Sequence, residues 1–365
     1  MDEKNPLVSI CIPTFNRAHS VWRTIESAIH QTYGNIEIIV VDNASTDDTR
    51  EVVMKYAKRD PRVKYFRNET NIGSGNNFLK CAEYASGFYM QALGSDDWLS
   101  KNYVEEGVKS FVLHPDAAAI ITNIITFELD KESGKLEFSD EVLMRPGKYS
   151  ADWFFSNIYL GKAGGAGFIS FLRREDSIVG LKKVLDNPVN MFQRGERREP
   201  FDMPIFLEIL AKYPAIFVTK KAAYVKTVHG KDHVGLEGES FETREGQLRY
   251  TIALRRAYES FYGSHGFEKH HNRLRFFGGL TIISNAILIF FSSRFGGADA
   301  GGYFEKVKEY FKDYSKKEKW LIMISIVPYA FLKIVGRFSG IFRGKRSFSP
   351  DPNYFLTEDL KFKAD

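Results

Sequence analysis

The segment Tyr89-Met90-Gln91-Ala92-Leu93-Gly94-Ser95-Asp96-Asp97-Trp98 decides how the first third of this chain is interpreted. An apolar run typical of a strand ends here in two adjacent carboxylates. Two like charges at a strand end must be solvated, paired with a cation or bound to a metal ion, and a divalent metal is the economical explanation. By itself an Asp-Asp pair is more often a loop or a helix cap, so the neighbouring sequence has to decide.

The sequence before this segment alternates between predicted strands and helices. Apolar runs of strand length occur at residues 7–12, 36–41, 63–66 and 88–93, and apolar residues at helical spacing lie between them. This alternation predicts a mostly parallel sheet, whose ligands gather at the carboxyl ends of the strands. Thr14, Asp42 and the Asp96-Asp97 pair all follow such ends. They indicate a ligand site, with an Asx turn or N-cap as the alternative for Asp42.

Five ordered motifs resemble the family 2 glycosyltransferases with the GT-A fold. They are Pro13-Thr14-Phe15-Asn16-Arg17, Asp42-Asn43-Ala44-Ser45-Thr46-Asp47, residues 71–77, Ala85-Ser86-Gly87-Phe88-Tyr89 and residues 93–99. The resemblance is close over residues 6–115 and looser to about residue 230. It implies an α/β fold, a Rossmann-like, mostly parallel sheet flanked by helices. It also implies transfer of a sugar from a nucleoside diphosphate sugar with inversion, usually with Mg²⁺ or Mn²⁺.

The carboxylate pair suits that chemistry. A departing diphosphate gains negative charge, which a hard divalent cation held by carboxylates stabilises. By the resemblance, Asp97 is the expected metal ligand, and Asp96 the contact to the ribose or to a shared metal ion. The family often has an Asp where this chain has Gly94, so the assignment between the two carboxylates stays open. His229 follows a predicted strand at residues 223–228 and is a further candidate ligand, with a solvated loop histidine as the alternative.

The nucleotide is expected to contact the first three motifs. The resemblance assigns nucleotide-sugar binding to Pro13, Thr14, Phe15, Asn16, Arg17, Asp42, Asn43, Asn76 and Asp96. Asn43 stands where similar enzymes have a second acidic residue, and its amide can both donate to and accept from a uracil or thymine edge. The donor is therefore a UDP- or dTDP-sugar. Many relatives place an Arg near the phosphates after the third strand, where this chain has residues 74–77, so Arg17 or the metal ion is expected to carry more of the phosphate charge.

Inverting transfer needs a general base that takes the proton of the attacking hydroxyl. Similar enzymes have an acidic residue ahead of a helix in the acceptor half, and the matching segment here is residues 199–210. Asp202 is the predicted base and Glu199 the second candidate, while an ordinary N-cap is the alternative for Asp202. The predicted helix turns Ile205, Ile209 and Leu210 inward.

Composition fits an intracellular enzyme, and the length fits one catalytic domain with an appended region. Of the 365 residues, 1–235 are expected to form the GT-A catalytic domain, with a nucleotide-sugar half at 1–115 and an acceptor half at 116–235. A helical region at 236–346 and a polar tail at 347–365 follow. Cys11 and Cys81 are both predicted in apolar elements, which indicates buried thiols. No signal sequence precedes the first predicted strand, so the catalytic part is expected in the cytosol.

Two apolar segments distinguish the C-terminal third. Residues 276–291 and 320–332 are apolar nearly all round, yet shorter than the roughly 20 residues of a spanning helix. Basic residues surround them, namely Arg273, Arg275, Arg294, Lys316, Lys317, Lys319, Lys333, Arg337, Arg343, Lys345 and Arg346. This pattern predicts a peripheral or monotopic attachment to an anionic membrane surface. A helical subdomain or a homo-oligomer interface is the alternative, and a net charge of only +5 argues against nucleic acid.

The predicted function is a metal-dependent inverting glycosyltransferase at the cytoplasmic face of the cell membrane. It is expected to move one sugar to a hydroxyl of a glycan acceptor, lipid-linked, in surface glycan biosynthesis. A processive polysaccharide synthase is the first alternative, although the chain lacks a Gln-x-x-Arg-Trp motif. The second is a catalytically inactive nucleotide-sugar-binding scaffold.

Overall fold

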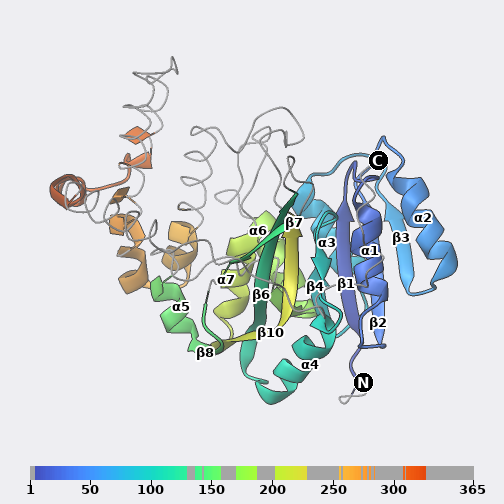
Figure 1. Ribbon diagram of the computed structural model, residues 1–365. Coiled ribbons are helices and arrows are strands. Elements are labelled where there is room, and N and C mark those ends of the chain that lie inside the picture. Colours follow the sequence, from blue (N-terminus) through green and yellow to red (C-terminus); the bar gives the residue numbers. More distant parts are fainter. Residues whose placement is uncertain are drawn as a thin grey trace. The chain divides into compact units, whose positions relative to one another are not determined.

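The computed structural model describes residues 5–129, 136–141, 144–157, 170–186 and 202–227, and then 255, 258–272, 274–277, 279–280, 283, 307–308 and 310–325. The described residues up to 227 belong to one compact unit, and those from 255 onward to a second (Figure 1). The boundaries predicted at residues 235 and 346 lie outside the described residues.

Four parallel strands form the N-terminal half of the sheet. They are β1 (Val8–Thr14), β2 (Ile36–Asp42), β3 (Val63–Arg67) and β4 (Tyr89–Ala92), in the spatial order β3-β2-β1-β4. All residues of β2 are buried, as expected for a β-branched run covered on both faces. The register pairs Thr14 with Asp42 and Asp42 with Arg67, so the polar strand ends meet at one edge. The predicted strands are confirmed.

The other half of the sheet is mixed. Strand β9 (Ser170–Arg173) is antiparallel to β4 and to β6 (Ala117–Leu129), and β6 is parallel to β10 (Ala215–Thr227). The short strand β5 (Trp98–Leu99) pairs antiparallel with β10. Strands β7 (Leu136–Glu141) and β8 (Gly147–Ser150) pair with β6 and β10. The sequence predicted a strand only at residues 223–228, which overlaps the carboxyl-terminal part of β10, and the register of β10 with β6 is irregular between Val218 and Ala223.

Helices cover both faces of the sheet (Figure 1). One face packs against α1 (Val21–Ile29), α2 (Thr49–Arg59) and α4 (Tyr103–Leu113), whose apolar residues share a buried core with alternate residues of β1. On the other face, α3 (Ser74–Tyr84) packs on β1, where the Cys11 thiol contacts the carbonyl of Cys81. Both cysteines are free and buried, as predicted. Helix α5 (Ala151–Asn157) follows β8.

Two further helices of the first unit pack against each other. Helix α6 (Arg174–Leu185) packs against α7 (Asp202–Leu210) at Gly180, where an added Cβ would lie 3.3 Å from the carbonyl oxygen of Ile205. An ion pair of 2.5 Å joins Lys183 to Glu208. The predicted helix at this place is confirmed, and Ile205, Ile209 and Leu210 are buried in it. Asp202 is its first residue.

A buried carboxylate fastens the amino ends of the strands. Oε1 of Glu37 accepts hydrogen bonds from the Ser9 hydroxyl at 2.6 Å and from the backbone N–H of Ser86 at 2.6 Å, and Oε2 accepts one from Lys64 at 2.7 Å. Burial alone would raise the pKa of Glu37, but the hydrogen bonds from Lys64, Ser9 and Ser86 together lower it. Only glycine leaves enough room at position 87, because a Cβ there would lie 2.6 Å from the Ser9 hydroxyl oxygen.

The second unit has a small core of its own among the described residues. Leu280, Tyr310, Phe311, Tyr314 and Ile322 are buried together, and Phe276, Phe277, Ile283 and Val307 pack against them. Arg275 lies over the Tyr314 ring at 3.9 Å and forms a 2.9 Å ion pair with Glu318. The described part of the first apolar segment is therefore packed against protein, and Arg275 is paired inside this core.

The helical stretch at residues 316–325 has two different faces. It begins with a capping box, in which the Ser315 hydroxyl accepts from the N–H of Glu318 and the Glu318 carboxylate accepts from the N–H of Ser315. Ile322 is buried, whereas Trp320, Leu321, Met323 and Ile324 are exposed. Within the residues that can be described, no helix has the length and apolar character needed to cross a membrane.

Candidate active site

Three loops meet at the carboxyl ends of the parallel strands. They follow β1, β2 and β4 and carry the first, second and fifth sequence motifs. The N–H of Asn43 donates to the carbonyl of Thr14 at 2.8 Å, which continues the β1–β2 pairing into the loops. The Thr14 side chain is buried, and its hydroxyl has no hydrogen-bond partner among the residues described here. A buried hydroxyl without a partner at a sheet edge is a place where a ligand could bind.

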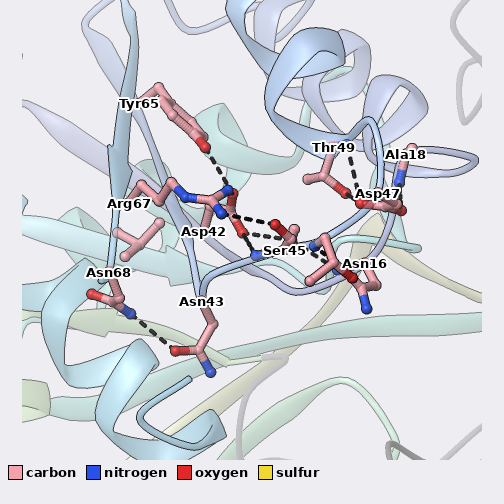
Figure 2. Close-up of polar contacts among 12 residues, drawn as sticks. Asn16, Ala18, Asp42, Asn43, Ser45, Asp47, Thr49, Tyr65, Arg67 and Asn68 are labelled. Atoms are coloured by element: carbon pink, nitrogen blue, oxygen red, sulfur yellow. Dashed lines mark hydrogen bonds and ion pairs between the residues drawn. The ribbon is translucent and has the colours of Figure 1, made fainter. Parts of the chain in front are cut away.

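Asp42 is fully buried and is held by four protein groups (Figure 2). Oδ1 accepts from the backbone N–H and the hydroxyl of Ser45, and Oδ2 accepts from Tyr65 at 2.7 Å and from Arg67 at 2.8 Å. Burial, followed by the hydrogen bond to Asp42, raises the pKa of Tyr65 to about 12. A carboxylate can accept about four hydrogen bonds, so these four bonds use all of its acceptor positions. In this arrangement Asp42 orders the loop after β2.

The loops after β1 and β2 are tied to each other. The N–H of Asn16 donates to the Ser45 hydroxyl at 2.9 Å, and Oδ1 of Asn16 accepts from the N–H of Thr46 at 2.8 Å (Figure 2). Asn16 and Ala44 have left-handed backbones, with φ of 51° and 65°. Such conformations are costly for residues other than glycine and occur often at functional sites.

Asp47 completes the link between these loops. Its Oδ2 accepts from the N–H of Ala18 at 3.1 Å, and its Oδ1 accepts from the N–H of Thr49 at 3.1 Å (Figure 2). Burial would raise the pKa of Asp47, but the hydrogen bond from the Thr49 hydroxyl, together with those from the N–H groups of Ala18 and Thr49, lowers it. The N–H of Arg17 donates to the Thr49 hydroxyl at 2.8 Å. The start of α2 thus fixes the backbone of Arg17.

Asn43 is the centre of an amide network. Its Nδ2 donates to Oδ1 of Asn71 at 2.6 Å, and its Oδ1 accepts from Asn68 and from the N–H of Ile72, both at 3.0 Å. Asn68 also donates to Asn77 at 2.8 Å. The amide of Asn43 therefore holds the segment between β3 and α3. Asn76, another predicted nucleotide ligand, is exposed and donates to the carbonyl of Ile72 at 3.0 Å.

Arg17 connects the first loop to the carboxylate pair. Its Nε lies 3.3 Å from Oδ2 of Asp96, and its Nη1 donates to the carbonyl of Asn16 at 3.3 Å. His19 follows in the same loop, where burial and then the charge of Arg17 lower its pKa. Neither side chain of the Arg17–Asp96 pair is fully buried. The pair places a cation and a carboxylate together at the carboxyl edge of the sheet.

Asp97 is held by a residue that the sequence did not indicate. The Tyr224 hydroxyl donates to Oδ2 of Asp97 at 2.8 Å and accepts from the N–H of Gly94 at 3.0 Å. Burial, and then the charge of Asp97, raise the pKa of Tyr224 well above its ordinary value. Tyr224 comes from β10 and is 127 residues away in the sequence, so no local pattern could have revealed the contact.

The remaining predicted site residues are placed as follows. Pro13 ends β1 with Thr14, and Phe15 is half-buried in the following loop. Asp202 begins α7, but its side chain lies outside the described residues, as do Glu199 and His229. The structure thus brings together the β1, β2 and β4 loops and leaves the predicted roles of these three residues as predictions.

The carboxylate pair fits a hard divalent cation. An ideal Cβ on Gly94 would lie 2.6 Å from Oδ2 of Asp97 and 3.2 Å from Oδ1 of Asp96, so both carboxylates converge above this glycine. The described residues contain no cluster of three or more candidate metal ligands. Mg²⁺ commonly uses one or two carboxylates together with phosphates of the substrate, and two converging carboxylates agree with such a site.

The chain is similar in sequence to a glycosyltransferase family. Residues 9–175 match the model described as Glycosyl transferase family 2. The putative teichuronic acid biosynthesis glycosyltransferase TuaG of Bacillus subtilis is 35% identical over 106 residues, 29% of this chain and 42% of that protein. The UDP-Glc:alpha-D-GlcNAc-diphosphoundecaprenol beta-1,3-glucosyltransferase WfgD of Escherichia coli is 38% identical over 95 residues, 26% of this chain and 37% of that protein. The chondroitin synthase of Pasteurella multocida is 35% identical over 117 residues, 32% of this chain and 12% of that protein.

The chain spans less than half the length of each of these relatives. Solved structures are similar over more of it. Staphylococcus aureus TarS 1-349 in complex with UDP-GlcNAc has a TM-score of 0.60 and 16% identity, covering 89% of this chain and 87% of that one. The mannosyltransferase PcManGT of Pyrobaculum calidifontis, in complex with GDP-Man and Mn²⁺, has a TM-score of 0.50 and 14% identity, covering 90% and 87%. The predicted fold class, with helices in the C-terminal part, is confirmed.

Proposed function

From the premise that the chain carries a family 2 glycosyltransferase domain on a GT-A fold, we propose that it transfers one sugar from a UDP- or dTDP-sugar to a hydroxyl of a glycan acceptor, with inversion. The observation that supports this most is the convergence of Thr14, Arg17 and the Asp96-Asp97 pair at one edge of the sheet. A buried hydroxyl, a cation and two hard ligands match the parts of a nucleoside diphosphate.

The nucleoside is proposed to lie over the loops after β1 and β2. Asn43 uses one of its two amide N–H donors in the network, and the other could serve a carbonyl of uracil or thymine. Asp42 acts through the loop that it holds together with Arg67. The Thr14 hydroxyl supplies a further hydrogen-bonding group. In this proposal these groups recognise a uracil or thymine base, so the donor is a UDP-sugar or a dTDP-sugar.

The diphosphate is proposed to lie against Arg17 and the carboxylate pair. The Arg17 guanidinium would neutralise phosphate charge, since this chain has no Arg among residues 74–77. Asp97 and Asp96, with His229 as a further candidate, would hold Mn²⁺ or Mg²⁺. When bound, such an ion stabilises the charge of the leaving diphosphate as a Lewis acid. Asp96, which Arg17 contacts at 3.3 Å, would also contact the ribose.

Asp202 is proposed as the general base and Glu199 as the second candidate. The contact of α6 with α7 at Gly180 and the Lys183–Glu208 ion pair fix the helix that begins at Asp202. Asp202→Asn tests the assignment, because an amide cannot take the proton of the acceptor hydroxyl. It should keep donor affinity and lower turnover by roughly 100-fold or more. Loss of donor binding would instead make Asp202 a donor ligand or a structural residue.

The acceptor is proposed to be lipid-linked, as the name of WfgD states for that relative. The second unit would hold the enzyme at the cytoplasmic face of the membrane through the exposed side of residues 316–325. Lys316 and Lys317 are exposed there together with Trp320 and Ile324. Basic residues beside exposed aromatic and aliphatic side chains suit an anionic lipid surface.

A thermal-shift screen with UDP-, dTDP- and GDP-sugars, each with Mn²⁺, tests the donor assignment. A ligand at 100 times its dissociation constant stabilises the folded state by about 2.7 kcal/mol. Stabilisation by a UDP- or dTDP-sugar, and not by GDP-sugars, is expected. Stabilisation by a GDP-sugar alone would contradict the pyrimidine assignment, and donor binding without turnover in any acceptor mixture would favour a scaffold.

A further inference from the structure

Tyr224 reaches the carboxylate pair from inside the sheet. Strand β10 pairs with β5, which places Tyr224 opposite Leu99, two residues after Asp97. The aromatic ring is part of the main buried core, and only 2% of the residue is exposed. Its hydroxyl lies where the core ends and the site begins, between Oδ2 of Asp97 and the N–H of Gly94.

The backbone around Asp97 is fixed separately from its side chain. The N–H of Asp97 donates to the carbonyl of Gly94 at 3.0 Å, and the carbonyl of Asp97 accepts from the Thr24 hydroxyl at 2.8 Å. These bonds hold the turn. The Tyr224 hydroxyl binds Oδ2 of this carboxylate, and Gly94 leaves open the space beneath it.

Gly94 is needed for this arrangement because of space. A Cβ at this position would lie 2.6 Å from Oδ2 of Asp97, which is closer than real Cβ contacts come. The backbone of Gly94 is not in the left-handed region, so an alanine is compatible with its φ. Gly94→Ala would therefore displace the Asp97 carboxylate and crowd Oδ1 of Asp96 at 3.2 Å, while its φ stays compatible with alanine.

We propose that Tyr224 is a positioning residue, which fixes the Asp97 carboxylate in the orientation that binds the divalent cation of the donor diphosphate. The inference rests on the proposed function and assigns a role to a residue outside all five sequence motifs. Hydrogen-bond partners that orient a metal ligand typically contribute 10- to 100-fold to metal affinity. In this proposal the Asp97 carboxylate binds the cation, the absence of a Cβ at Gly94 leaves room for that carboxylate, and the Tyr224 hydroxyl orients it.

The first test compares two tyrosines in the full chain. Mn²⁺ binding is measured by electron paramagnetic resonance of the free ion, in the presence of UDP, for the wild type, Tyr224→Phe and Tyr103→Phe. Tyr103 is the matched control, since it is also buried and its hydroxyl donates to Gln91 at 2.8 Å, away from the carboxylate pair. We expect Tyr224→Phe to weaken Mn²⁺ binding by about 10- to 100-fold and Tyr103→Phe to change it less than about twofold.

The second test uses Gly94→Ala, which acts on the same carboxylate by another route and keeps the inference testable if Tyr224→Phe folds poorly. Gly94→Ala should weaken Mn²⁺ binding by a similar factor. In the double variant the loss should be smaller than the sum of the two single losses, because both substitutions displace the Asp97 carboxylate, while the added Cβ also lies 3.2 Å from Oδ1 of Asp96.

Three results would overturn the inference. Unchanged Mn²⁺ affinity in Tyr224→Phe, in a wild type that binds Mn²⁺ with UDP, contradicts the inference alone. Equal losses in Tyr224→Phe and Tyr103→Phe would show a general structural role. If the wild type binds UDP but binds no Mn²⁺ when both are present, both the inference and the metal site of the proposed function are contradicted.

Discussion

Nη1 of Arg67 lies 2.8 Å from Oδ2 of Asp42, and the two residues stand opposite each other in the register of β2 and β3. Asp42 is fully buried, whereas the Arg67 side chain is 37% exposed. The same guanidinium donates through Nη2 to the carbonyl of Ser45 at 2.8 Å. One arginine thus balances the buried charge and fastens the loop after β2.

Arg67→Met should lower both stability and donor affinity. A lost hydrogen bond to a charged group costs about 1.5–3 kcal/mol, and the partial exposure of Arg67 favours the lower end. Denaturant unfolding with and without UDP measures both effects. Arg50→Met on the exposed side of α2 is the control and should change the free energy of unfolding by less than about 0.5 kcal/mol. Equal stability of the two variants would show that Asp42 does not depend on Arg67.

Ala44→Gly should stabilise the protein. An L-residue in the left-handed conformation costs about 1–2 kcal/mol, and glycine avoids this cost. The gain is partly offset because glycine has more conformational freedom in the unfolded chain. Since Ala44 has φ of 65°, we expect the free energy of unfolding to rise by about 0.5–1 kcal/mol. Ala57→Gly within α2 is the opposite control and should lose about 1 kcal/mol. A loss of stability in Ala44→Gly would contradict the strain argument.

The Glu37 carboxylate makes stability depend on pH. Its pKa is lower in the folded protein than in the unfolded chain, so its contribution is present above the unfolded pKa of about 4.3 and is lost as pH falls through the folded pKa. Glu37→Gln should therefore be less stable than the wild type at pH 7, by about 1–2 kcal/mol since Lys64 is partly exposed. The difference should shrink in unfolding experiments below pH 4. If the difference in unfolding free energy between the wild type and Glu37→Gln stays constant down to pH 3, it does not come from the charge of Glu37.

The exposed side of residues 316–325 should bind anionic vesicles. Trp320→Ser with Ile324→Ser should lower sedimentation with phosphatidylglycerol vesicles by at least about tenfold, because it removes apolar area that salt cannot replace. Salt alone should release the wild type only in part, by screening the lysines. The control is Val112→Ser with Leu113→Ser, two exposed apolar residues of α4. Equal binding by the two double variants would refute a membrane role for this surface.

Local patterns were sufficient to predict the parallel strands of the N-terminal half and several helices. The β-branched runs of β1 and β2 and the helical spacing of α1 and α7 are properties of adjacent residues, and all four elements form as predicted. The carboxyl ends of parallel strands meet at one edge, so the position of Thr14 and Asp42 followed from topology.

Contacts between distant segments could not be predicted in the same way. Tyr224 reaches Asp97 because β10 pairs antiparallel with β5, which places Tyr224 opposite Leu99, and no local pattern predicts that pairing. The first apolar C-terminal segment was expected at a lipid surface or, alternatively, in a helical subdomain, and its described residues Phe276 and Phe277 pack against Tyr310 and its neighbours. Hydrophobic periodicity does not distinguish lipid from a protein partner.

Release of the nucleoside diphosphate, measured with and without acceptor and divalent cation, tests the central claim most directly. The wild type should release UDP or dTDP from its donor only when Mn²⁺ or Mg²⁺ and a lipid-linked glycan acceptor are present. Asp97→Asn should fold normally, as judged by its melting temperature, and release none above background, since a neutral amide is a weak ligand for a hard cation. Normal turnover by a folded Asp97→Asn protein would contradict the account.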